Sequence, residues 1–391
     1  MRWRILALLF FARIALGIQF QTLASVGDDL VVAFGMDYAG IGMLIGLFMA
    51  PGLFLAMPAG FMGRYLPDRA LSALGLGALA AGGLVSGVAS TEWVIGLGRL
   101  LAGAGFLFAT LYFTKMVADW FDGREIATAM SILVMSWPFG IAMGQVGHTW
   151  LAAAFGWRIP FLVASAYCAI AALAVLTMYR PANDARGTQP VAAPRLSARD
   201  WQLTVCAGAA WGLFNAGYVV YLSFGPKMLE VLGYPALAAA GIISVGSWLM
   251  IISGALCGQV ADRLGRRQTI LTICMTAAVA SLLMLNIPGA GLPASLLFGL
   301  LGMAPAGVIM ALAGEALPPQ KRAFGMGIFF TVYYAIMTAA PPVAGSIFDA
   351  TDSPYGPLVM GALLFAAVLP AALAFRFFKL AGDPGPVRQA S

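Results

Sequence analysis

Long apolar segments alternate with short polar ones along nearly the whole chain. Stretches such as Leu71–Val88 and Ile159–Met178 contain no charged residue, and an α-helix needs about 20 such residues to cross a bilayer. Division at charges and at Pro- and Gly-rich turns gives twelve candidate spans. These are 5–26, 38–61, 70–89, 94–116, 126–152, 159–179, 202–225, 237–260, 269–287, 294–315, 323–347 and 356–378. The pattern predicts an all-α membrane protein with twelve transmembrane helices.

The longest polar segment, residues 180–201, lies between the sixth and seventh spans. We therefore predict two six-helix bundles, residues 1–179 and 202–379, joined by a linker at 180–201 and followed by a tail at 380–391.

An internal repeat supports two pseudo-symmetric bundles. The loop after the fourth span (Ala118–Arg124) resembles the loop after the tenth (Gly314–Arg322), because each contains an acid, then a base, and precedes a helix start rich in small residues. Duplicated halves of this kind are typical of transporters that rock about a site at the midplane.

Composition agrees with a bilayer as the main solvent. Hydrophobic residues make up 61% of the 391 and charged residues only 10%, against about 25% charged residues in soluble domains. The net charge of +6 does not indicate nucleic-acid binding, because the basic residues follow a membrane topology. Only Arg158 and Lys227 fall on the side opposite the termini, and Arg13 and Arg99 lie within spans. By the positive-inside rule, we expect cytoplasmic termini in a cell inner membrane.

One loop carries a family signature. Residues 258–267 read Gly-Gln-Val-Ala-Asp-Arg-Leu-Gly-Arg-Arg, which resembles the Gly-x-x-x-Asp-Arg-x-Gly-Arg-Arg loop of the major facilitator superfamily, at its usual place between spans 8 and 9. The resemblance implies a bacterial-type transporter with this superfamily's fold. In such a loop, an acid facing a helix N-terminus and a base makes contacts that exist in one access state only. The gating residues we expect from this loop and from the repeated loops are Asp262, Arg263, Arg266, Asp119, Arg124, Glu315 and Arg322.

The equivalent loop of the first half, residues 60–69, departs from the signature. Arg64 stands where the acid is expected, and Pro67 replaces the second glycine. The usual charge pairing at this gate is therefore in doubt.

Charged residues inside spans are costly, about 2.5–3.5 kcal/mol on insertion scales, and are functional candidates by default. Arg13 and Arg99 are such residues, whereas all 16 acids map to loops or span ends. Residues 99–105 also resemble the superfamily's Arg-x-x-x-Gly-x-Gly motif, whose arginine is often linked to proton coupling. An electropositive interior favours a small, organic anion as substrate. Two structural alternatives stay open, in which Arg13 extends to the cytoplasmic surface and Arg99 only ties span 4 to its neighbours.

Other polar and aromatic side chains share helix faces with these arginines or lie in spans expected to line a central cavity. The substrate-binding candidates are Arg13, Gln21, Arg99, Asn215, Tyr218, Trp248, Tyr333 and Tyr334. For the single histidine, His148, we favour a structural role over a proton shuttle.

The sequence thus predicts a secondary active or facilitative transporter that moves a small organic anion by alternating access. Two alternatives remain: a proton-coupled exporter of a drug-like or neutral metabolite, and a membrane sensor that has lost transport. Expected partners are the substrate, the lipid bilayer, and either protons or a counter-anion; uniport also stays open. We expect a monomer and no nucleic acid. We expect no enzyme, cofactor or metal site, because no span carries a paired acid and base, and the four cysteines lack metal-binding spacing.

Overall fold

The computed structural model describes residues 1–63, 65–121, 125–182, 196–317 and 319–381. Within these residues the chain forms helices and no strands. The first bundle contains α1 (Arg2–Ser25), α2 (Gly27–Phe34), α3 (Tyr38–Leu47), α4 (Pro51–Met62), α5 (Asp68–Gly87), α6 (Glu92–Trp120), α7 (Ile126–Phe155) and α8 (Arg158–Met178). The second contains α9 (Ala198–Val231), α10 (Ala236–Leu264), α11 (Arg267–Met284), α12 (Gly291–Leu297), the π-helical turn η1 (Phe298–Gly302), α13 (Ala306–Ala316), α14 (Pro319–Thr351) and α15 (Tyr355–Leu380).

These helices make twelve segments that are long and apolar enough to cross a membrane, which confirms the predicted number of spans. Two spans are interrupted. The second consists of α3 and α4, and the tenth of α12, η1 and α13. The break in span 2 precedes Pro51, which has no N–H to donate to the preceding turn and is well suited to begin a helix.

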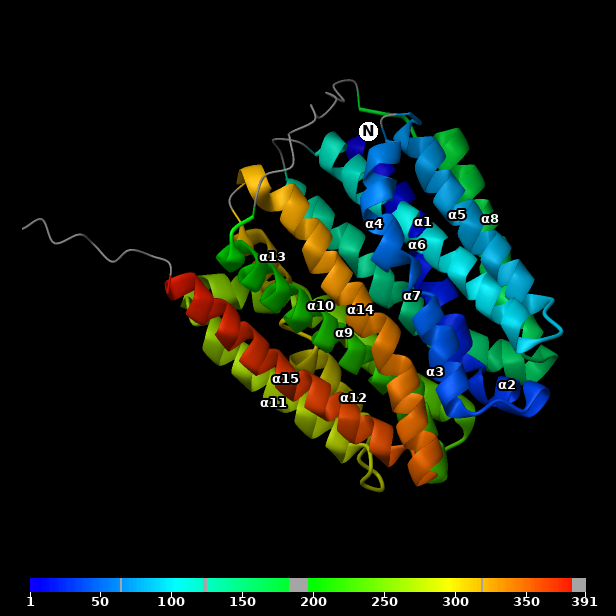
Figure 1. Ribbon diagram of the computed structural model, residues 1–391. Helices are drawn as coiled ribbons and strands as arrows, with labels where there is room; N and C mark the ends of the chain where they lie inside the picture. The colour runs from blue at the N-terminus through cyan, green and yellow to red at the C-terminus, as the bar shows by residue number, and fades with distance from the viewer. Residues whose placement is uncertain (64, 122–124, 183–195, 318, 382–391) are drawn as a thin grey trace, which may run out of the picture.

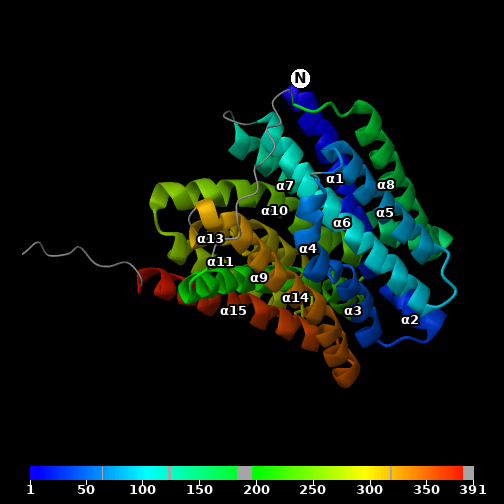
Figure 2. The same cartoon turned by 45° about the horizontal axis from the view of Figure 1, so that its top comes forward.

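The helices pack as two bundles, as predicted. In the first, α5 lies against α6 and α8, and α1 lies against α7; in the second, α9 lies against α14 and α15. Figure 1 and Figure 2 show the helices of the first bundle, blue to green, beside those of the second, green to red. The residue boundaries of the bundles stay a prediction, and most of the expected linker and tail (183–195 and 382–391) lies outside the described residues.

The two bundles meet mainly along two seams, α3 with α14 and α7 with α10. We call the face at which α1 begins and α15 ends the terminal face, and the other the opposite face. The α3–α14 seam lies in the half of the protein nearer the opposite face and brings two backbones together. A Cβ built on Gly42 would lie 2.7 Å from Pro342 Cα, and one on Gly345 would lie 2.7 Å from Ala39 N. Only glycine permits this approach.

Candidate functional site

Arg99 lies inside the first bundle, with 1% of its surface exposed. Its guanidinium donates to three backbone carbonyls, Leu44 O at 3.2 Å, Gln19 O at 3.1 Å and Phe20 O at 3.5 Å. It also lies 4.4 Å from the centre of the Phe48 ring. The Leu44 carbonyl accepts this bond at the C-terminal end of α3, where Phe48 N bonds to Ile45 O. Arg99 therefore ties α1, α3 and α6 together at the break in span 2.

Arg13 is also buried, with 8% of its surface exposed. Its Nη1 donates to Leu133 O at 2.8 Å, Val134 O at 3.4 Å and Ser136 Oγ at 3.2 Å, all on α7. Pro138, four residues after Val134, has no N–H, so the Val134 carbonyl lacks its normal helical partner. Arg13 supplies a donor there. Its side chain thus turns toward α7 and does not extend to the terminal face, while its buried Nε has no partner among the described residues.

Gln21 and His148 belong to a buried polar cluster between α1 and α7. Gln21 Nε2 donates to Gln145 Oε1 and, at 3.4 Å, to Ser25 Oγ. His148 Nε2 lies 3.0 Å from Ile18 O and 3.3 Å from Thr22 Oγ1. These contacts join two helices of one bundle, and the structural role favoured for His148 stays a prediction.

The candidates of the second bundle lie in different surroundings. Tyr218 is buried, with its hydroxyl 2.6 Å from Ser247 Oγ, and Asn215 Nδ2 donates to Trp211 O of its own helix at 2.8 Å.

Three aromatic candidates lie nearer the seams. Trp248 is 38% exposed and meets Phe139 of the first bundle edge-on, with ring centres 5.0 Å apart. Tyr333 and Tyr334 are buried on α14. The Tyr334 ring lies against α4, because a Cβ on Gly52 would come within 2.5 Å of it. The structure therefore does not gather the eight candidates into one cavity.

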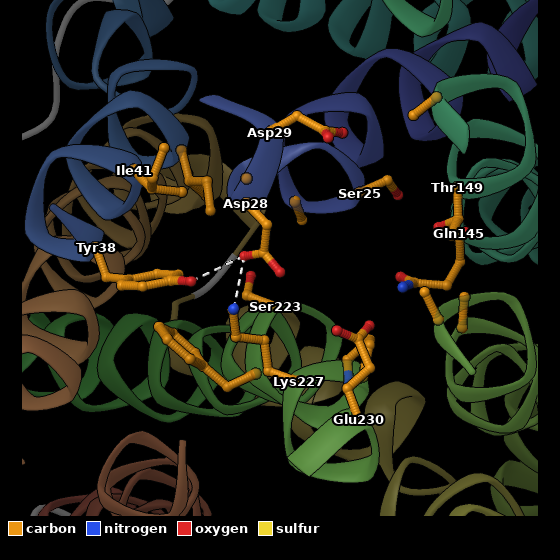
Figure 3. Close-up of a pocket in the computed structure, with 18 of the residues that line it drawn as sticks. Ser25, Asp28, Asp29, Tyr38, Ile41, Gln145, Thr149, Ser223, Lys227 and Glu230 are labelled. Atoms are coloured by element: carbon orange, nitrogen blue, oxygen red, sulfur yellow. Dashed lines mark hydrogen bonds and ion pairs between the residues drawn. The ribbon is translucent and has the colours of Figure 1, made fainter. Parts of the chain in front are cut away.

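A cavity of about 220 Å³ lies between the bundles at the opposite face. The ends of α1, α7 and α9 line it, together with α2 and the starts of α3 and α10. The polar residues of its lining are Ser25, Asp28, Asp29, Tyr38, Gln145, Thr149, Ser223, Lys227 and Glu230 (Figure 3). None of the eight substrate-binding candidates belongs to the lining.

An ion pair crosses the cavity from one bundle to the other. Lys227 Nζ of α9 lies 2.8 Å from Asp28 Oδ1 of α2, and the Tyr38 hydroxyl donates to the same oxygen at 2.9 Å. The ammonium also lies over two rings, 4.7 Å from the centre of Tyr38 and 5.8 Å from that of Phe348. Partial burial, with the charge of Asp28 as the smaller cause, raises the pKa of the neighbouring Asp29.

A second polar contact closes the same face. The Asp349 carboxylate of α14 accepts hydrogen bonds from Tyr38 N at 2.9 Å and Ala39 N at 2.7 Å, in the first turn of α3. A carboxylate is stabilised there by the unpaired N–H groups and by the helix dipole. At the opposite face, side chains of the second bundle thus bind groups of the first bundle at two places.

At the terminal face, the ion pairs among described residues stay within one bundle. Glu315 accepts from Arg267 and from Lys379, each at 2.6 Å, and Asp119 lies 3.3 Å from Lys115. Lys115 also pairs with Asp68, so the degenerate loop does provide an acid, at a position other than that of Arg64.

The remaining gating candidates are exposed or lie outside the described residues. Arg263 and Arg266 are exposed at the end of α10 and the start of α11. Arg124 and the side chains of Asp262 and Arg322 lie outside the described residues. Their roles stay predictions. Among the residues that the structure does describe, no group of three or more His, Cys, Asp or Glu is arranged to hold a metal ion.

Comparison with known proteins decides the family. The family model described as the Major Facilitator Superfamily matches residues 9–333. The chain belongs to the major facilitator superfamily. The match covers most of the chain and confirms the resemblance seen in the loop between spans 8 and 9, so this protein is a multi-pass membrane transporter.

Two relatives of this chain are named as transporters. It is 25% identical over 396 residues to a cis,cis-muconate transport protein of Acinetobacter baylyi, with 94% of each chain covered. It is 24% identical over 271 residues to a probable 4-methylmuconolactone transporter of Cupriavidus pinatubonensis, with 64% of this chain and 61% of that one covered.

Solved structures show the same fold. A bacterial homologue of the human lysosomal transporter Spinster, in an inward-facing and unoccupied conformation, matches with a TM-score of 0.72 at 16% identity, over 97% of this chain and 96% of that one. The nucleoside transporter NupG matches with a TM-score of 0.73 at 15% identity, over 98% of this chain and 100% of that one.

The cavity residues Asp28, Lys227 and Glu230 were not among the substrate-binding or gating residues predicted from the sequence. A signal for them does exist in the sequence. Spans 1 and 7 occupy equivalent positions in the repeated halves, and each is followed or ended by charged residues at the opposite face, Asp28 and Asp29 in one case and Lys227 and Glu230 in the other. Lys227 is also one of only two basic residues assigned to that side.

Proposed function

We propose that this transporter moves a small organic anion across the bacterial inner membrane by alternating access, with its terminal face in the cytoplasm. The observation that carries this proposal is the buried charge. Arg13 and Arg99 are buried, and no Asp or Glu among the described residues is. Carbonyl dipoles and one aromatic ring surround these arginines, and no carboxylate of the described residues pairs with them.

A positive interior favours an anionic substrate over a cationic one. A desolvated cation needs a counter-charge, and the described spans bury no carboxylate to supply it. The arginines act on the anion first through their field, because the N–H groups that they use are already bound to backbone carbonyls and to Ser136 Oγ. Direct contact would use the unpartnered Arg13 Nε or would follow exchange of a carbonyl partner in another conformation. The relatives named for muconate and 4-methylmuconolactone transport support a substrate of this size and chemistry.

The orientation rests on the distribution of basic residues. Most Lys and Arg residues flank the terminal face, as the positive-inside rule requires of a cytoplasmic face. With this orientation, the polar contacts of Asp28, Lys227 and Asp349 lie on the periplasmic side and hold the two bundles together there.

Uptake into proteoliposomes tests the proposal. We expect saturable uptake of labelled cis,cis-muconate, loss of uptake in Arg99→Gln and Arg13→Gln, and no uptake of a cationic dye or a nucleoside. Transport of the cation or the nucleoside without transport of any carboxylate would contradict it. Repeating the assay with an inward proton gradient, and with muconate preloaded inside, separates proton coupling and exchange from uniport.

A further inference from the structure

Lys227 is the basic residue among the lining of the opposite-face cavity, and the structure shows it binding a carboxylate. Asp28 Oδ1 lies 2.8 Å from the ammonium, a normal distance for a charge-assisted hydrogen bond. The two partners belong to different bundles, since Asp28 is on α2 and Lys227 is on α9 (Figure 3). The pair must therefore separate whenever the opposite face opens.

Separation leaves Lys227 in a wall of the open cavity with its carboxylate partner removed. An ammonium without a partner in a half-buried site is a strong attractor for any carboxylate that enters. We propose that Lys227 binds the carboxylate of the incoming substrate when the opposite face is open, and that Asp28 takes the place of this carboxylate when the empty transporter closes. The inference rests on the proposed anionic substrate and adds a binding residue to it.

The other acids of the cavity make the charge of Lys227 more important for binding an anion. Asp29 and Glu230 also line the space, so the lining carries three carboxyl groups and one ammonium. Their field repels an anion, and Lys227 is the side chain of the lining whose charge opposes it. Glu230 allows competition for Lys227 to be distinguished from a general effect of charge, because it shares the cavity but forms no hydrogen bond or ion pair with Lys227 in the structure.

Competition between Asp28 and the substrate for Lys227 has a consequence for the mode of transport. Since Asp28 can replace the substrate at Lys227, the transporter can close its opposite face with no substrate bound. A transporter that closes and returns empty performs net transport, whereas one that needs substrate in order to close is limited to exchange. The Asp28–Lys227 pair seen in the structure is the contact that such a closed state requires.

The test is the KM for cis,cis-muconate in proteoliposomes. Lys227→Gln should raise KM at least about tenfold, and Asp28→Asn should lower it several-fold because it frees the ammonium. Glu230→Gln removes one negative charge from the same cavity and should lower KM by less than Asp28→Asn does. Arg2→Gln, which breaks the Arg2–Glu125 pair of 2.6 Å within the first bundle, should leave KM unchanged.

Several results would overturn the inference while leaving the anionic function intact. If Lys227→Gln and Asp28→Asn shift KM in the same direction, the pair acts only as a contact between bundles. If Glu230→Gln matches Asp28→Asn, the cavity acts through its field alone. Net uptake adds a further check, because Asp28→Asn should slow net uptake more than muconate–muconate exchange.

A thiol-labelling assay gives a readout that does not depend on flux. Ser223 lies one helical turn before Lys227 and lines the cavity, with its hydroxyl buried. The Ser223→Cys variant should react with an impermeant thiol reagent faster when Asp28→Asn is added, and muconate should slow that reaction. Lys227→Gln should abolish the protection. Protection that persists without Lys227, or that is absent from every variant, would refute the assignment, and the unmodified protein with its native cysteines provides the background.

Discussion

The seam between α3 and α14 allows the strongest quantitative prediction. A Cβ built on Gly46 would lie 3.2 Å from Thr338 C and closer still to Thr338 O. Pro342, four residues after Thr338, cannot donate to that carbonyl, so its oxygen is left facing α3. The obstruction is backbone on both sides, and rotation of a side chain cannot relieve it. The Gly46→Ala variant can close its opposite face only by moving the two helices apart.

The cost falls on one conformational state. Forcing an extra carbon into a packed contact costs about 1–3 kcal/mol, and here the open state avoids that cost because the bundles are apart. The equilibrium between closed and open states should therefore shift toward open by roughly 5- to 150-fold. Gly77→Ala on α5 is the matched control, because a Cβ at Gly77 meets no atom within 4 Å and gains the same helix propensity.

The Ser223→Cys reporter measures this shift. Its rate of modification by an impermeant thiol reagent should rise in Gly46→Ala and stay at the parent value in Gly77→Ala. Transport of muconate should slow in the first variant because the closed state is part of the cycle. Equal labelling rates in the two glycine variants would refute the reasoning, since they would show that the seam does not limit closure.

Two further predictions concern stability. Arg13→Gln leaves Val134 O without a hydrogen-bond donor and should cost about 1–3 kcal/mol. The loss should be smaller in a Pro138→Ala background, where residue 138 regains an N–H for Val134 O, and equal losses in both backgrounds would show that Arg13 does not act through this carbonyl. For Asp29, a pKa that is higher in the folded state than in the unfolded state means that ionisation opposes folding above the usual carboxyl range. Asp29→Asn should therefore raise the Tm near neutral pH and lose this effect in acid, and a Tm gain that persists in acid would contradict this explanation.

Hydropathy predicted the twelve spans because each span is a local property of the sequence. The interruption of span 2 was harder to predict. Pro51 is visible, but Pro138 and Pro226 lie inside continuous helices. Packing distinguishes the proline at the break from those inside continuous helices. A Cβ on Gly103 of α6 would lie 3.1 Å from Phe48 Cα at the break, and such a close approach depends on residues distant in the sequence.

Dependence on residues distant in the sequence also limited the prediction of the site. The sequence correctly placed Arg13 and Arg99 within spans, but the carbonyls that bind them lie on other helices, and their availability depends on breaks and prolines there. Lys227 was assigned to a loop because span 7 was expected to end at residue 225, whereas α9 continues to Val231. Its partner Asp28 is far away in the sequence, and no local pattern connects the two.

The distribution of contacts indicates which parts of the transporter move together. Arg99 joins α1, α3 and α6, and Arg13 joins α1 to α7, each through buried hydrogen bonds inside the first bundle that would be costly to break. Between the bundles, the described polar contacts are the half-exposed ones of Asp28 and Asp349 at the opposite face. Contacts that exchange with water are broken at low cost. Alternating access in this transporter should therefore proceed by rocking of two rigid bundles, with the glycine seam and the Asp28–Lys227 pair re-forming each time the opposite face closes.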